Sequence, residues 1–308
     1  MSSKDNPIAV PPQEDLTEVK KPTSLLVAQF FLFPLIIIAF GVGIFVLFGV
    51  VAYEEKSPEA YLTQIRNGRG SSVFDRRMWQ AATELTNVIA VRADELRDTP
   101  FASELLDVYV EARPNSLEDP ADLVEALRLR RFLALSLGHL GNPEAVGALS
   151  EGLDDQDSET QLWTLWSLGE IADPMAAEAV ANKIGSSDAA VRKMAVYVLG
   201  VLKNPIVIDD LQIALNDPAP DVRWNAAMSL AQLGDASGSE LLMRLTSRDF
   251  LAQYDLMSDE DRENVITNAV QCLGLLKLDG ARDHLVSLSE DDPSLKVRDA
   301  ALAALEFY

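Results

Sequence analysis

Few side chains in this sequence could carry out catalysis or bind a metal ion, and they are widely spaced. The chain contains two histidines, His139 and His284, and a single cysteine, Cys272. A zinc site needs several such ligands in one place, and a nucleophile needs a base beside it. The two histidines stand in distant parts of the chain, so they cannot complete such a cluster with Cys272. We therefore predict no metal site, no cofactor and no catalytic residues, and expect Cys272 to be a small buried apolar residue.

Carboxylates are abundant, but their positions favour a structural role. Three aspartate pairs, Asp154-Asp155, Asp209-Asp210 and Asp291-Asp292, stand at expected turns or helix ends, where carboxylates cap helices. None of them has the spacing of a calcium-binding EF-hand loop. The sequence also lacks a phosphate-binding P-loop, a dinucleotide-binding glycine pattern and a nucleophile elbow. These observations argue against an enzyme.

The helices expected from this sequence recur with a 31-residue period. The clearest copy is DVRWNAAMSL at 221–230, and related segments occur at 190–199, 162–168 and 131–137. The copies end in Leu137-Gly138, Leu168-Gly169, Leu199-Gly200 and Leu230-Ala231. Self-similarity at this period predicts stacked pairs of helices. The second helix of one pair should bury a stripe made of Val191, Ala195, Val198, Leu199 and Leu202.

This pattern resembles the HEAT repeat in its short bacterial form, which also occurs in phycobilisome-lyase-like repeats. The matching residues are Asp-Val-Arg at 221–223, Val191-Arg192, Lys296-Val297-Arg298 and the prolines Pro143, Pro174 and Pro205. The resemblance implies an all-α fold, a right-handed α-solenoid of helix pairs over 119–308, preceded by divergent N-terminal capping helices over 54–118. It also implies a bacterial source. It further implies structural ion pairs for the arginines that begin the second helices: Arg130, Arg192, Arg223 and Arg298.

Two columns of side chains on the second helices point away from the predicted core. One contains Leu135, Trp166, Tyr197 and Met228, and the other Arg131, Leu162, Lys193 and Trp224, with Trp79 aligned to Trp224. In HEAT-like solenoids the second helices line the concave surface, so these columns indicate a partner-binding groove. The candidate partner-binding residues are Trp166, Tyr197, Met228, Leu162, Trp224 and Trp79. The alternative is burial between adjacent repeats, and we expect Trp163, next to the core stripe, to be buried in this way.

The N-terminal part of the chain predicts a membrane anchor. Residues 1–24 are proline-rich and read as a disordered tail, whereas 25–53 contain no charged side chain. These 29 residues exceed the roughly 20 that a helix needs to cross a bilayer. We predict an uncleaved transmembrane helix in the cell (inner) membrane. Lys20 and Lys21 slightly favour a cytoplasmic tail and an extracytoplasmic solenoid, but the opposite orientation stays open.

The charge balance narrows the choice of partner. The net charge is −22, which disfavours nucleic acid, because its phosphates need Lys and Arg. The leading hypothesis is a membrane-anchored, non-catalytic scaffold that binds a protein within a bacterial membrane complex. The alternatives are a phycobilisome-lyase-like enzyme or chaperone and a purely structural spacer.

Between 230 and 273 the period lengthens, which places an insertion at 247–258, between the two helices of one unit.

Overall fold

The computed structural model describes residues 40, 42–43, 56–69, 76–113 and 120–308. Apart from residues 40, 42 and 43, the predicted tail at 1–24 and transmembrane helix at 25–53 lie outside the described residues. Within the described part, no helix has the length and apolar character that crossing a bilayer requires. The chain divides into two compact units, 1–56 and 57–308, and the second contains the repeats.

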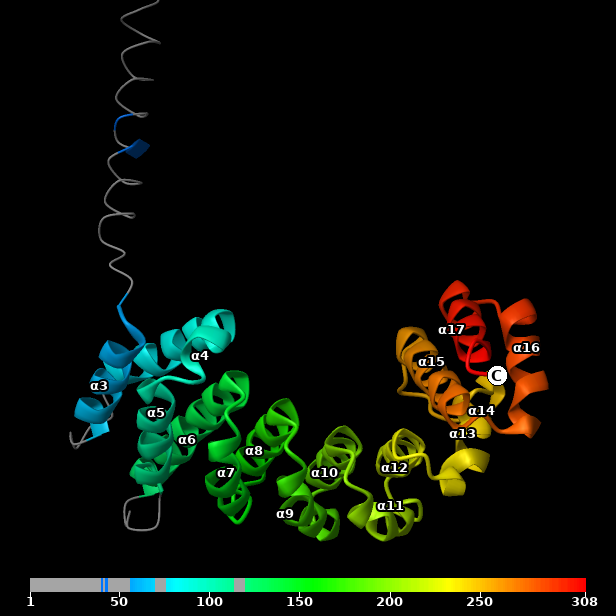
Figure 1. The fold of residues 1–308 in the computed structure, drawn as a ribbon, viewed down its shortest axis with the longest axis horizontal. Coiled ribbons are helices and arrows are strands. Elements are labelled where there is room, and N and C mark those ends of the chain that lie inside the picture. The colour runs from blue at the N-terminus through cyan, green and yellow to red at the C-terminus, as the bar shows by residue number, and fades with distance from the viewer. Residues whose placement is uncertain (1–39, 41, 44–55, 70–75, 114–119) are drawn as a thin grey trace, which may run out of the picture. The chain divides into compact units, whose positions relative to one another are not determined.

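Residues 57–308 form helices wherever regular structure is described, and no strand occurs among these described positions (Figure 1). The helices are α3 (Pro58–Arg69), α4 (Arg76–Leu96), α5 (Pro100–Glu111), α6 (Pro120–Leu140), α7 (Val146–Gly152), α8 (Ser158–Ile171), α9 (Ala177–Ala181), α10 (Ala189–Leu202), α11 (Ile208–Ala214), α12 (Pro220–Gln232), α13 (Ser239–Leu245), α14 (Arg248–Leu251), α15 (Asp259–Leu276), α16 (Asp279–Asp291) and α17 (Leu295–Leu305). The second helices α4, α6, α8, α10, α12, α15 and α17 each contact the next one in this order. They form one row, and the first helices form the other (Figure 1). The predicted repeat of helix pairs is confirmed.

Each of three successive units begins with the same turn. Asn142, Asp173 and Asn204 precede a proline, and each side chain accepts a hydrogen bond from the backbone N–H two residues later. Proline suits the first helical position because the N–H that it lacks has no partner inside the helix. The Asn204 side chain also donates to the backbone oxygen of Pro174, 3.1 Å away, and so joins two units. The recurring Asn-Pro and Asp-Pro pairs therefore start the first helices.

The apolar stripe of α10 lies where the sequence predicts it. Val191, Ala195, Val198, Leu199 and Leu202 are all buried. The residues equivalent to Leu199, which are Leu137, Leu168 and Leu230, have no exposed surface either. The helical phase derived from the period is therefore correct.

The glycine that follows Leu137, Leu168 and Leu199 allows neighbouring second helices to approach closely. A Cβ atom built on Gly138 would lie 2.8 Å from the Cα atom of Ser167 on α8. One built on Gly200 would lie 2.5 Å from the Oγ atom of Ser229 on α12. Ser229 uses this proximity, because its hydroxyl donates to the backbone oxygen of Val196 at 2.9 Å. The Leu-Gly phrase thus sets the spacing between repeats.

We expect Gly138→Ala to destabilise the fold, because the added methyl group would collide with the backbone of α8. Overpacking of this kind lowers the free energy of unfolding by about 1–3 kcal/mol. Gly147→Ala is the matched control, because Gly147 lies in α7 and nothing stands within 4 Å of its Cβ position. That change should raise the free energy of unfolding by up to about 1 kcal/mol, since alanine restricts the unfolded chain. Urea denaturation followed by circular dichroism measures both, and equal effects would contradict the close approach.

The insertion lies between α13 and α15, as predicted, and it folds back onto the repeats. It contains α14, followed by Tyr254, whose ring packs edge-on against Trp224 with centroids 4.8 Å apart. Phe250 also packs edge-on against Tyr254, with centroids 6.0 Å apart. Ser258 then caps α15 by accepting a hydrogen bond from the Asp261 N–H at 3.1 Å, as its sequence predicts. The extra residues therefore cover part of α12.

Candidate functional site

Helix α8 presents an exposed stripe of two tryptophans between two glutamates. Glu159, Trp163, Trp166 and Glu170 are spaced by four, three and four residues, so they share one face of the helix. We call these four residues the α8 stripe. Trp163 is 38% exposed and Trp166 is 42% exposed, whereas Thr160, Thr164, Leu165 and Leu168 of the same helix are buried. Two large aromatic side chains therefore face solvent side by side.

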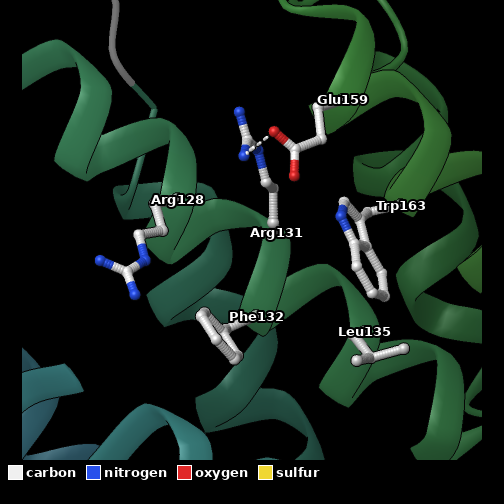
Figure 2. A pocket seen from close by; sticks show the side chains of 6 residues that line it. All are labelled: Arg128, Arg131, Phe132, Leu135, Glu159 and Trp163. Atoms are coloured by element: carbon white, nitrogen blue, oxygen red, sulfur yellow. Dashed lines mark ion pairs between the residues drawn. The ribbon is translucent and has the colours of Figure 1, made fainter.

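A first pocket, of about 220 Å³, lies between α6 and α8. Its lining residues are Arg128, Arg131, Phe132, Leu135, Glu159 and Trp163. Figure 2 shows Phe132 and Leu135 of α6 and Trp163 of α8, with Leu135 below Trp163 in this view. Apolar side chains line its centre, and charged ones lie at its edge.

A second pocket, of about 160 Å³, lies between α8 and α10. It is lined by Trp166, Gly169, Glu170, Tyr197, Val198 and Val201. Tyr197 is exposed and contributes an aromatic ring from α10. The α8 stripe thus has one pocket on each side, and we call the two pockets together with the stripe the α8 groove.

Ion pairs position the charged groups of the α8 groove. Arg131 binds Asp157 at 2.7 Å and also pairs with Glu159 (Figure 2). Burial opposes ionisation of Asp157, but hydrogen bonds from Thr160 and Arg131 outweigh it and lower the pKa of this carboxyl. At the other end of the stripe, the Oε2 atom of Glu170 lies 2.9 Å from Nδ1 of His139.

The structure brings together only part of the predicted partner-binding set. Trp166 and Tyr197 are exposed and share the second pocket. Leu162 and Met228 are partly buried and pack against the two hydrophobic cores. Trp79 packs against Phe132, with centroids 6.1 Å apart, so it flanks the first pocket without lining it.

Trp224 differs from the expectation of an exposed side chain. It is only 6% exposed, because Tyr254 of the insertion covers it. Trp163 differs in the opposite direction, since it faces solvent and lines the first pocket instead of packing in the core. Its spacing of four residues from Glu159 and three from Trp166 was the signal in the sequence that could have placed it on the side of α8 that faces away from the core.

Two of the four arginines that the sequence places at the start of second helices join successive repeats through ion pairs, although Arg130 lies in the middle of α6. Arg130 binds Asp155 at 2.7 Å, and Arg192 binds Asp217 of the next repeat at 2.7 and 3.0 Å. The hydrogen bond from Arg192 lowers the pKa of the Asp217 carboxyl. The other two arginines, Arg223 and Arg298, donate to backbone oxygens instead.

His139, His284 and Cys272 contact different partners: Glu170, Thr246 and the backbone oxygen of Met228. His284 shares a hydrogen bond of 2.7 Å with Thr246, and burial lowers the pKa of this imidazole. Cys272 is buried, as expected, and burial raises the pKa of its thiol to about 11. The described residues contain no group of three or more metal-binding side chains.

Comparison with known proteins identifies the repeats. The family model for HEAT repeats matches residues 121–183 and 177–254. A search of curated protein sequences finds no match. Among solved structures, the chain is similar to the complex of CpcE and CpcF of phycocyanin lyase from Nostoc sp. PCC7120, with 21% identity and a TM-score of 0.51. The match covers 82% of this chain and 87% of that one.

A designed armadillo repeat protein also matches, with 20% identity and a TM-score of 0.42 over 65% of this chain and 98% of that one. At these identities the structural matches bear on the fold alone. The match to the phycocyanin lyase complex and the family match agree with the repeat geometry described above. Residues 121–254 thus match the model for HEAT repeats, and the described repeats form an all-helical solenoid.

Proposed function

We propose that this chain is a non-catalytic scaffold that binds a protein through the α8 groove. The observation that carries the proposal is the pair of exposed tryptophans, Trp163 and Trp166, with a pocket on each side. Exposed apolar surface costs solubility, and where it gathers beside pockets it marks interaction sites. Tryptophan and tyrosine also contribute much of the binding energy at protein interfaces. The groove therefore has the composition of a partner site.

The same proposal includes attachment to a membrane, within a bacterial membrane complex. Its support is the uncharged segment 25–53, which is long enough to cross a bilayer, and the basic pair Lys20-Lys21 before it. Anchoring would hold the repeats near membrane-bound partners and raise their effective concentration. The orientation that we favour places the repeats outside the cytoplasm.

Two alternatives make different predictions. A phycobilisome-lyase-like enzyme or chaperone would act on a tetrapyrrole-bearing protein. Only the shared fold favours this alternative, and a fold alone does not imply an activity. A purely structural spacer would need no binding surface at all. Such a spacer would tolerate loss of the tryptophans, whereas a scaffold that uses the α8 groove would not.

Replacing Trp166 by Ala should weaken binding of the native partner by more than about 2 kcal/mol, a loss of roughly 30-fold. The test is affinity purification from native membranes with tagged wild-type and variant chains, with quantification of each co-purifying protein. Met175→Ala is the control, because Met175 is 83% exposed but lies in the turn that precedes α9, outside the groove. Unchanged partner recovery with a folded Trp166→Ala variant would sink the proposal and favour the spacer.

Deletion of residues 25–53 should release the chain from membranes. The wild-type chain should stay in the pellet after carbonate extraction, because a transmembrane helix is not removed by disrupting ionic contacts. The deleted chain should move to the supernatant, and far-ultraviolet circular dichroism would check that its helices persist. Recovery of a natural product that begins after residue 50 would contradict an uncleaved anchor.

A further inference from the structure

We infer that the segment that binds the α8 groove is a cationic, arginine-containing stretch of a partner protein. This inference rests on the proposed function and names the chemistry of the partner. It starts from the order of residues on the α8 stripe, in which a carboxylate stands one turn before Trp163 and another one turn after Trp166. Side chains four residues apart on a helix are direct neighbours. A guanidinium group on either tryptophan ring would therefore be within reach of a glutamate.

The chain itself contains a filled version of this arrangement. The Arg130 guanidinium lies over the ring of Tyr109, 4.4 Å from its centroid, and binds the Asp155 carboxylate at 2.7 Å. Two further arginines, Arg128 and Arg244, lie over the rings of Trp79 and Phe250 at 4.6 and 4.5 Å. Among the described residues, no cation occupies the ring of Trp163 or Trp166. The α8 stripe thus offers two ring faces without a cation, beside carboxylates that Arg131 and His139 contact from the side of the protein.

The charge of the surroundings favours a basic partner. Residues 57–308 contain 42 acidic and 22 basic side chains, a net charge of −20. At the α8 groove, the carboxylates of Asp157, Glu159 and Glu170 outnumber the guanidinium groups of Arg128 and Arg131 by one. Lys193 lies 3.6 Å from Asp221 and is also balanced. An acidic surface attracts a cationic segment and repels nucleic acid and anionic lipid.

The shape of the site favours a peptide segment over a single small cation. The two pockets lie on opposite sides of α8, and packed helices are separated by about 8–10 Å. A ligand that contacts both pockets must span at least this distance, which requires several residues. Apolar side chains next to the arginines would fill the pockets beside Leu135 and Val201.

The experiment uses the full-length chain in detergent and three synthetic peptides of identical length, in which arginine alternates with leucine, lysine with leucine, or glutamine with leucine. Isothermal titration calorimetry should show the arginine peptide binding at least 10-fold more tightly than the glutamine peptide. The affinity of the lysine peptide should lie between the two. Trp163→Ala and Trp166→Ala should each weaken arginine-peptide binding several-fold. Circular dichroism confirms that each variant is folded.

The matched charge variants decide whether the site is specific. Glu159→Gln and Glu170→Gln together should reduce arginine-peptide affinity at least 5-fold. Glu178→Gln with Asp209→Asn removes the same charge from exposed positions on α9 and α11, and should change affinity less than 2-fold. Equal losses in both pairs would mean diffuse attraction to an acidic surface, and would overturn the inference.

A competition assay separates this inference from the proposed function. If the arginine peptide displaces the co-purified native partner and the glutamine peptide does not, the inference holds. If Trp166→Ala abolishes partner recovery but the glutamine peptide competes as well as the arginine peptide, the scaffold proposal stands and the cationic partner is wrong. If no partner depends on Trp166, the proposed function itself fails.

Discussion

Replacing Leu199 by Ala should lower the free energy of unfolding by about 2–5 kcal/mol. Leu199 has no exposed surface, and it lies at the centre of the buried stripe of α10. Removing its side chain deletes buried apolar contacts and leaves a cavity, because the helices on either side are held by their own packing. Urea denaturation monitored by circular dichroism gives the value.

Leu302→Ala is the control for this change, since it removes the same atoms from a helix of the same row. Leu302 lies in α17 and is 55% exposed, so its loss should cost less than about 1 kcal/mol. A loss of similar size at both positions would show that the stripe is not the core of the repeat. A loss confined to Leu199 supports the helical phase on which the orientation of the α8 stripe also depends.

Replacing Asp155 by Ala should destabilise the chain by about 3–5 kcal/mol, because it leaves the guanidinium of Arg130 buried without its counter-charge. The Arg130 side chain is 2% exposed and that of Asp155 12%. Burial raises the pKa of the Asp155 carboxyl, although the charge and the hydrogen bond of Arg130 oppose this shift. The pair is therefore held at a substantial desolvation cost, and neither partner can be removed alone without penalty.

The neighbouring residue supplies the control. Asp154 pairs with Lys183 at 3.3 Å but is 87% exposed, so Asp154→Ala should change stability by less than about 1 kcal/mol. A second comparison replaces both partners, Arg130 by Met and Asp155 by Leu. This double variant should recover most of the stability lost in Asp155→Ala, since apolar groups of similar volume avoid the desolvation cost. Similar losses for Asp154→Ala and Asp155→Ala in denaturation curves would contradict this account.

The repeats could be predicted because their causes are local and periodic. The spacing of Val191, Ala195 and Leu199 defines one helical face, and the Asn-Pro and Asp-Pro pairs define where the first helices begin. Both signals lie within a dozen residues and recur. The structure adds the physical reason for the Leu-Gly phrase, since Gly138 lies against the backbone of the next second helix.

The candidate site was only partly predictable, because it depends on contacts between distant residues. The 31-residue period alone places Trp166 and Tyr197 on the side of their helices that faces away from the core. The burial of Trp224 could not be predicted, since it results from Tyr254 in an insertion that breaks the period. Trp163 stands beside the core stripe in sequence, and its exposure depends on the space left between α6 and α8.

Helix α12 takes part in two separate hydrophobic clusters. Val222, Ala226 and Leu230 belong to the cluster that extends toward the N-terminus, whereas Trp224 and the other buried apolar residues of α12 belong to the cluster around α15 and α17. In solenoids each repeat contacts only its neighbours, so cooperativity is transmitted from one interface to the next. Helix α12 packs into both hydrophobic clusters, so it is the position at which folding cooperativity between them can be interrupted. We therefore expect the segment after α12 to open before the repeats that form the α8 groove when the chain is destabilised.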